Sequence, residues 1–153
     1  MAAQHPCLWL LRHAEPLIAP GVCYGQLDVP ADPSATLQAG MRFAHVMPAH
    51  ALIRYSPLQR CAHLAQAAQT PQNFLVDDER LKEMHFGRWE GQSWNDIGRA
   101  AVDAWSRALY NHAPGAGESL AAMLQRVRAA LLDSCSTTAS LARAMWCGSR
   151  TQG

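Results

Sequence analysis

Two short apolar runs in this chain each stop abruptly at polar residues. The first run, residues 7–11, is followed by Arg12 and His13. The second run, residues 51–55, is apolar apart from Arg54 and is followed by a polar cluster that ends at Arg60. Runs of this length and composition are typical of strands buried in a parallel sheet. We therefore expect two strands here, with the polar residues at their carboxyl ends, where open α/β sheets bind their ligands.

Segments with helical spacing alternate with these runs. Ser34 or Thr36 can cap a first helix, Ser93 can cap a third, and a last helix covers about 120–132. A short run at 73–76 predicts one further strand. The apolar positions expected to face the core are Leu37, Met41 and Ala44 in the first helix, Leu58, Cys61, Leu64, Ala65 and Ala68 in the second, Trp94, Ile97, Ala101, Trp105 and Leu109 in the third, and Leu120, Met123, Leu124, Val127 and Leu131 in the last.

This alternation predicts a single α/β domain with a largely parallel sheet. A chain of 153 residues is long enough to bury a substantial core. After the helix at 120–132 such a sheet needs another strand. Residues 134–153 lack the β-branched apolar run of a buried strand. The sheet is therefore expected to be short of its last strand.

Two loops are expected between these elements. Residues 17–33 contain repeated Pro and Gly, which exclude a regular helix, and this loop can fold over the site. Residues 81–91 combine two glycines with large side chains at no fixed period, which indicates an ordered loop. The acidic residues at 77–79 between them are interpreted as a solvated turn.

Composition narrows the class of partner. Hydrophobic residues make up 49% of the chain, charged residues 16%, and the net charge is +1. This balance lacks the basic footprint of a nucleic-acid-binding protein. The run at 7–11 is too short for a signal peptide or a membrane span. We expect a cytoplasmic protein with no membrane partner. Five cysteines without paired spacing indicate no zinc site, and no cofactor or metal is expected.

Arg12 and His13 together suit a phosphate. A guanidinium can bind two phosphate oxygens while an imidazole attacks phosphorus or donates a proton. Arg60 lies in the first turn of a predicted helix, where free backbone N–H groups also attract anions. The alternative is a solvated loop whose charges have no role.

Four stretches occur in order along residues 8 to about 132. They are LRHAEP at 11–16, SPLQRC at 56–61, LKE at 81–83 with FGRWEG at 86–91, and PGAGES at 114–119. Together they resemble the histidine phosphatase superfamily, also called phosphoglycerate mutase-like. The resemblance implies a three-layer α/β/α sandwich with a mostly parallel central sheet, here lacking the last strand or strands.

The resemblance also implies roles for four residues. His13 would be the nucleophile that forms a phosphohistidine, with its other ring nitrogen held by a backbone carbonyl. Arg12 and Arg60 would bind the phosphoryl oxygens. Glu83 would protonate the leaving oxygen and then take a proton from the attacking water.

Two carboxylates have alternative interpretations. From the residues alone, Glu83 could be a surface carboxylate paired with Lys82 or Arg80. Glu15 could orient a group in the site, or it could equally pair with Arg12.

Residues 21–30, GVCYGQLDVP, look like a segment of the α-ribazole phosphatase branch, which serves cobalamin synthesis. On this basis Tyr24 and Gln26 are candidate substrate-pocket residues. His85, which lies two positions after Glu83, is a third candidate.

The chain departs from the family pattern in two places. The commoner pattern follows the histidine with Gly and places a hydroxyl residue two positions further on, where this chain has Ala14 and Pro16. The family also supplies a second histidine after a late strand, and this chain has no histidine beyond His112. We therefore expect an incomplete histidine phosphatase domain over 1–132, followed by an atypical tail over 133–153.

A frameshift would explain this tail. Residues 145–153 can be encoded, with GC-rich codons, by a DNA string that in another frame reads Val-Val-Arg-Val-Thr-His-Ala-Gly. That string resembles the missing strand and histidine, so we expect the tail to be a frameshift product and the domain to be truncated.

The expected function is metal-independent hydrolysis of a small phosphorylated metabolite, with α-ribazole 5′-phosphate as the candidate from the branch resemblance. One alternative is a phosphoglycerate mutase-like phosphoryl transferase. The other is an inactive or phosphometabolite-binding remnant, because the second pocket histidine is missing.

Overall fold

A computed structural model describes residues 7–148, and it describes side chains through Thr138. Single 3-10 turns lie at Glu79–Leu81, Gly87–Trp89 and Pro114–Ala116. The helices and strands follow in the order α1 (Pro33–Val46), β1 (Leu52–Tyr55), α2 (Gln59–Ala67), β2 (Phe74–Asp77), α3 (Trp94–Ile97), α4 (Arg99–Arg107) and α5 (Leu120–Gly148).

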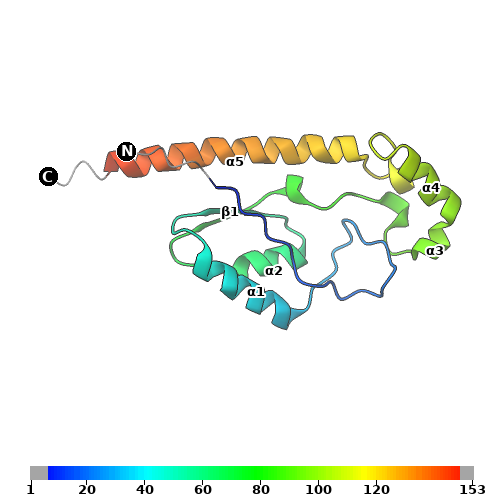
Figure 1. Ribbon diagram of the computed structural model, residues 1–153, viewed down its shortest axis with the longest axis horizontal. Helices are drawn as coiled ribbons and strands as arrows, with labels where there is room; N and C mark the ends of the chain where they lie inside the picture. The colour runs from blue at the N-terminus through cyan, green and yellow to red at the C-terminus, as the bar shows by residue number, and fades with distance from the viewer. Residues whose placement is uncertain (1–6, 149–153) are drawn as a thin grey trace.

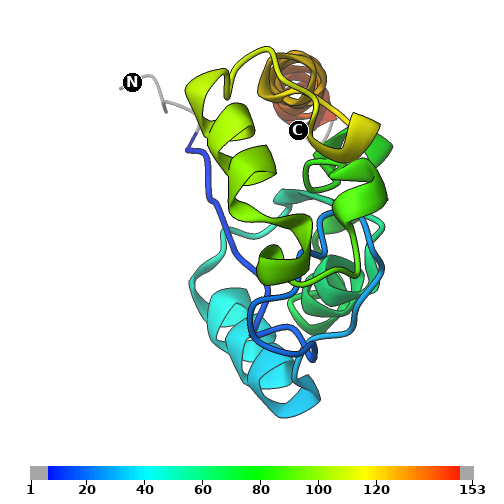
Figure 2. The same ribbon diagram turned by 90° about the vertical axis from the view of Figure 1, so that its right-hand side faces the viewer.

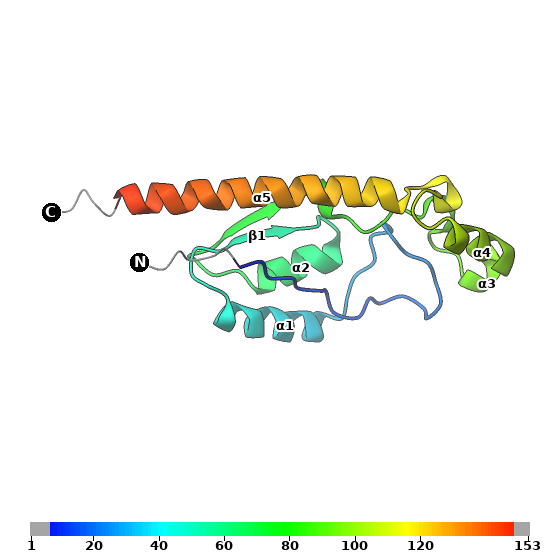
Figure 3. The ribbon, with the colours of Figure 1, turned by 45° about the horizontal axis from the view of Figure 1, so that its top comes forward.

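The two strands form the centre of a layered α/β/α arrangement. β1 and β2 pair in parallel, with Leu52 opposite Phe74 and Tyr55 opposite Asp77. α5 runs along one face of this sheet, while α2 covers the other face and α1 packs outside α2 (Figures 1, 2 and 3). The predicted fold class and both predicted strands at 51–55 and 73–76 are confirmed.

The predicted strand at 7–11 is wrong, because these residues have no strand assignment. Among the described residues the sheet contains β1 and β2 alone. Leu10 is 88% exposed and Leu8 66%, and Trp9 instead packs edge-on against Phe43 of α1, with ring centroids 5.8 Å apart. An apolar run becomes a strand only where a neighbour completes its backbone hydrogen bonds, and the described residues supply no such neighbour.

The buried face of α1 also differs from the prediction. The cap is Asp32, whose carboxylate accepts a hydrogen bond from the N–H of Ala35 at 2.6 Å, and neither Ser34 nor Thr36 has this role. Thr36 and Gly40 are the buried residues of α1. Two predicted core residues are half exposed instead, Leu37 at 54% and Met41 at 52%. Small residues of α1 form its contact with α2, because the two helices approach each other closely.

The predicted helix over 93–109 is divided into α3 and α4 at Gly98, whose φ is +85°. Ser93 caps α3 as predicted. The rings of Trp94 and Trp105 then stack with centroids 6.4 Å apart, and Phe86 packs edge-on against both. Trp89 also contacts both indoles edge-on. This aromatic cluster packs the loop at 81–91 against α3 and α4.

The helix predicted at 120–132 extends much further, since α5 runs to Gly148. Its buried face passes through Ala130, which is 1% exposed, whereas Leu124 and Leu131 are 48% and 42% exposed. A narrow stripe therefore faces the sheet, and two predicted core leucines lie outside it. Within the described residues, neither α5 nor any other helix is long and apolar enough to cross a membrane. The end of the predicted tail, 149–153, lies outside the described residues.

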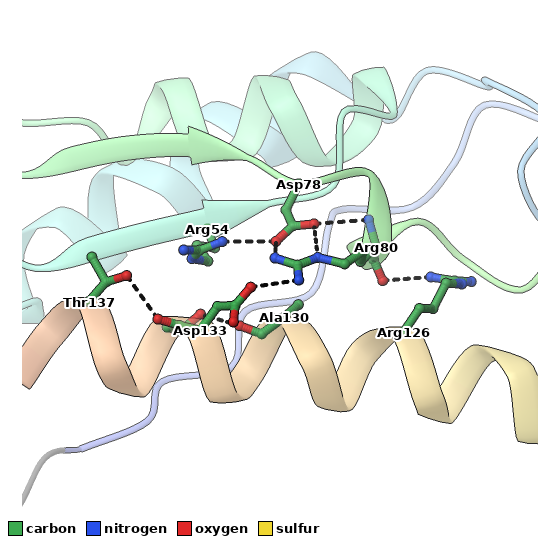
Figure 4. Close-up of polar contacts among 8 residues, drawn as sticks. Arg54, Asp78, Arg80, Arg126, Ala130, Asp133 and Thr137 are labelled. Carbon is green, nitrogen blue, oxygen red and sulfur yellow. Dashed lines mark hydrogen bonds and ion pairs between the residues drawn. The ribbon is translucent and has the colours of Figure 1, made fainter.

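Asp78, directly after β2, ties the sheet to the following turn and to α5 (Figure 4). It is 7% exposed, and its carboxylate accepts hydrogen bonds from Arg54 of β1 at 2.9 Å and from Arg80 at 2.8 and 2.9 Å. Arg80 also pairs with Asp133 of α5 at 2.7 Å. The hydrogen bonds from Arg80, with a contribution from Arg54, hold the pKa of Asp78 well below its usual range. The predicted solvated turn at 77–79 is therefore wrong for Asp78.

We predict that Gly40→Ala destabilises the fold. A Cβ at Gly40 would overlap the Cβ of Ala67 and lie 2.6 Å from the carbonyl carbon of the same residue. Separating α1 from α2 should lower the free energy of unfolding by about 1–3 kcal/mol, more than helix propensity returns. Urea denaturation measures this, with the exposed helix substitution Gln38→Ala as the control. A Gly40→Ala protein as stable as the wild type would contradict the close packing.

We also predict that Asp78→Asn weakens the protein at about pH 7 by about 2 kcal/mol, through loss of hydrogen bonds to a charged group. Because the folded pKa of Asp78 is depressed, its contribution is present above the unfolded value of 3.8 and is lost as the pH falls toward the folded value. The decline in stability between about pH 4 and pH 2 should be shallower in Asp78→Asn. Denaturation measured at about pH 7 and between about pH 4 and pH 2 tests both effects. The control is Asp77→Asn, at an exposed neighbouring position. Equal pH profiles for Asp78→Asn and wild type would contradict this role.

Candidate functional site

A cavity of about 190 Å³ lies where the amino-terminal segment, the start of α2, the turn at 81–83 and α5 meet. His13, Arg60 and Glu83 all line it, although they come from separate parts of the chain. The remaining walls are Leu58, Cys61, Leu81, Lys82, Met123 and Val127. The structure therefore brings together three of the four residues to which the resemblance assigns roles in catalysis or phosphate binding.

His13 is held by its own backbone. Its Nδ1 lies 2.7 Å from the carbonyl oxygen of Ala14. A carbonyl oxygen can only accept, so this contact assigns a proton to Nδ1, and in the neutral ring the lone pair is then on Nε2. This neutral tautomer is the form that can attack phosphorus.

Arg60 is 1% exposed and is bound to the loop at 17–33. Its guanidinium donates to the carbonyl oxygens of Gly25 at 2.7 Å and Leu27 at 3.1 Å, and it lies over the ring of Tyr24, 5.3 Å from the centroid. Its Nε is buried and has no hydrogen-bond acceptor among the described residues. Arg60 thus connects the cavity to this loop, and its Nε–H has no acceptor there.

The amino terminus of α2, beside Arg60, already has a carboxylate partner. The backbone N–H of Gln59 donates to the carboxylate of Asp28 at 2.7 Å, and the side chain of Gln59 donates to the backbone carbonyl of Asp28 at 2.7 Å. The helix terminus predicted to attract an anion therefore binds Asp28, which anchors the same loop to α2.

Glu83 has an exposed side chain, and its carboxylate accepts a hydrogen bond from the N–H of Met84 at 2.8 Å. The alternative that Glu83 pairs with Lys82 or Arg80 is wrong, because both cations have other partners. Lys82 pairs with Glu79 at 2.6 Å, and Arg80 pairs with Asp78. Glu83 is therefore not paired with either cation, and it lines the cavity.

The turn that carries Glu83 is held by Arg126 of α5, which sequence reasoning missed. Arg126 donates to the carbonyl oxygens of Arg80 at 2.7 Å, Lys82 at 2.6 Å and Glu83 at 3.0 Å. It also donates to both carboxylate oxygens of Glu118, at 2.6 and 2.7 Å. The available signals were the position of Arg126 three residues after the inward-facing Met123 and the place of Glu118 in the PGAGES stretch.

The partner of Arg126 is itself a perturbed group. Glu118 is mostly buried, and the hydrogen bonds from Arg126 lower the pKa of its carboxyl below the ordinary value. Glu118 therefore stays ionised beside the guanidinium at neutral pH.

Arg12 does not line the cavity and has an exposed side chain. The described residues show no ion pair between Arg12 and Glu15. Glu15 lies instead on a larger hollow of about 610 Å³ together with Asp32, and two carboxylates among apolar residues do not suit a phosphate.

The three candidate substrate-pocket residues do not line the cavity either. Tyr24 lies against Arg60. The side chain of Gln26 donates to the carbonyl oxygen of Glu83 at 2.9 Å. His85 has an exposed side chain, and its backbone N–H donates to Glu118 at 3.3 Å. In this structure Tyr24 and Gln26 support the cavity residues from behind.

The arrangement combines an imidazole, a guanidinium and a carboxylate around one small space. Pockets for drug-sized ligands span about 300–1,000 Å³, so this cavity suits a smaller group. These three side chains can supply a nucleophile, a positive charge for an oxyanion, and a proton donor and acceptor.

Comparison with known proteins agrees with this chemistry. The sequence model of the histidine phosphatase superfamily (branch 1) matches residues 8–142. A relative from Hydrogenobacter thermophilus (strain DSM 6534 / IAM 12695 / TK-6), named putative phosphoserine phosphatase 2, is 33% identical over 134 residues, or 82% of this chain. This chain spans 65% of the length of that relative.

Two solved structures are similar as well. A phosphoglycerate mutase from Thermus thermophilus is 30% identical, with a TM-score of 0.62 over 78% of this chain and 67% of the mutase. A protein called mycobacterial hydrolase 1 is 25% identical, with a TM-score of 0.70 over 81% of this chain and 62% of the hydrolase. The chain therefore belongs to the histidine phosphatase superfamily.

Proposed function

We propose that this protein hydrolyses a small phosphorylated metabolite through a phosphohistidine on His13. The observation that carries the proposal is the shared cavity of His13, Arg60 and Glu83. The contact between Nδ1 of His13 and the carbonyl of Ala14 supports it further, because that contact leaves Nε2 free to attack.

The reaction has two displacements at phosphorus. First, Nε2 of His13 forms a bond to phosphorus while the ester P–O bond breaks, and Glu83 gives its proton to the departing oxygen. Second, water attacks the phosphohistidine, the P–N bond breaks, and Glu83 takes the proton from the water. Arg60 stabilises charge on the phosphoryl oxygens in both steps. One carboxyl group serves both steps because the water enters on the side from which the alcohol left.

Substrate and partner are proposed on separate grounds. α-Ribazole 5′-phosphate is the first substrate to test, because residues 21–30 look like that branch. Phosphoserine is the second, because the Hydrogenobacter relative is named a putative phosphoserine phosphatase. The cytoplasmic location and the lack of nucleic-acid and membrane partners stay predictions from composition.

A second candidate function is binding of a phosphometabolite without turnover. Two observations favour it: the chain has no histidine after His112, and the guanidinium of Arg60 already donates to two backbone carbonyls. A protein of this kind would be stabilised by phosphate esters against thermal unfolding but would release no phosphate.

We predict that the protein releases phosphate from p-nitrophenyl phosphate in the presence of a chelator and that His13→Ala lowers kcat by at least about 10³-fold, since it removes the nucleophile. His45→Ala, at an exposed position of α1, is the control. Equal rates for His13→Ala and wild type would exclude the phosphohistidine. Thermal stabilisation by the ester without any phosphate release would favour the binding function.

We also predict hydrolysis rather than transfer between hydroxyl groups. A phosphate ester with a second free hydroxyl group should yield inorganic phosphate and no phosphate isomer, without a phosphorylated primer. Phosphorus NMR of the product mixture distinguishes the two. An isomer formed faster than inorganic phosphate, and only with primer, would instead support a mutase, the activity for which the similar Thermus protein is named.

A further inference from the structure

The most heavily hydrogen-bonded side chain near the cavity is that of Arg126, which does not itself line the cavity. Its guanidinium makes five hydrogen bonds, three to backbone carbonyls of the turn at 80–83 and two to the carboxylate of Glu118. A guanidinium has five N–H donors, so every donor of Arg126 is accounted for. Its side chain is 19% exposed and that of Glu118 is 16% exposed.

These hydrogen bonds hold the backbone of the turn at Glu83, the proposed general acid. The carbonyl oxygens of Lys82 and Glu83 both face Arg126, and Gln26 donates to the same carbonyl of Glu83 from the opposite loop. The orientation of these two peptide groups determines where the Glu83 side chain leaves the backbone. The carboxylate of Glu118 orients Arg126 in turn, because it binds the guanidinium in a bidentate pair.

We propose that Arg126 is a positioning residue that holds the Glu83 carboxyl in line with the phosphorus–oxygen bond to be broken. The inference rests on the proposed function. It adds that α5, through Arg126 and Glu118, determines how well Glu83 transfers its proton. A misplacement of about 1 Å can cost about 10²-fold in rate, so a loosened turn is enough to impair this step.

Lysine cannot replace this arginine. An ammonium group keeps the charge beside Glu118 but has three donors on a flexible stem, so it cannot bind three carbonyls and a bidentate carboxylate together. Arg126→Lys should therefore leave the ion pair largely in place and loosen the turn. Arg126→Gln removes both the ion pair with Glu118 and the hydrogen bonds to the turn.

The test compares two esters in each variant. A nitrophenolate leaves without protonation, whereas an alkoxide or unsubstituted phenolate depends on the general acid. We would measure kcat/KM for p-nitrophenyl phosphate and for phenyl phosphate. This parameter reports steps through the first P–O cleavage. Because each ratio of the two values comes from one protein sample, any unfolded fraction lowers both values equally and cancels.

We expect Glu83→Gln to lower the ratio of phenyl to p-nitrophenyl phosphate by about 10²-fold. Arg126→Gln should lower it by about 10-fold and Arg126→Lys by somewhat less. The matched control is Arg128→Gln, two residues further along the same helix at an exposed position, and its ratio should stay within about twofold of wild type.

Three results would overturn the inference, and they can be told apart. If Glu83→Gln lowers the ratio and both Arg126 variants keep the wild-type ratio, Arg126 serves only stability. If Arg128→Gln lowers the ratio as much as Arg126→Gln, the effect is not specific to the hydrogen bonds that Arg126 makes to the turn at 80–83. If Glu83→Gln itself keeps the wild-type ratio, or the wild type releases no phosphate, the proposed function fails and the inference fails with it.

Discussion

The cavity is lined in part by irregular chain, and irregular chain leaves backbone carbonyl oxygens that no helix or sheet pairs. Such groups are costly to bury without a donor. Two arginines meet this constraint. Arg60 donates to the carbonyls of Gly25 and Leu27, and Arg126 donates to three carbonyls of the turn at 80–83. The turn that borders the cavity and the loop at 17–33 are therefore both held by guanidinium groups on helices.

This arrangement gives Arg60 two tasks. It holds the loop at 17–33, and it also lines the cavity in which we propose that the phosphoryl group binds. Its Nε remains without an acceptor among the described residues. Arg126 has no such free donor, since all five of its N–H groups are used. The two residues thus differ in kind: one can contact the substrate, and the other acts through the backbone.

A second set of charges joins the sheet to α5. Asp78 lies at the carboxyl end of β2, and its partners Arg54 and Arg80 connect it to β1 and, through Asp133, to α5 (Figure 4). Asp78 begins the turn whose later carbonyl oxygens, at residues 80, 82 and 83, accept hydrogen bonds from Arg126. Polar contacts therefore connect α5 to the turn that carries Glu83. Met123 and Val127 of the same helix form part of the apolar wall of the cavity.

The amino-acid sequence alone was enough to predict the fold class, the family and the strands at 51–55 and 73–76. The resemblance carried by the motifs at 11–16, 56–61 and 81–91 pointed to His13, Arg60 and Glu83, and these residues line one cavity. The rest depended on tertiary packing. Whether 7–11 pairs as a strand depends on a neighbouring strand, and whether Leu37 or Gly40 is buried depends on how closely α2 approaches. The contacts of Arg126 depended on packing as well: its spacing from Met123 places it toward the inward face of α5, but only the packing of this helix brings it to the carbonyls of the turn at 80–83.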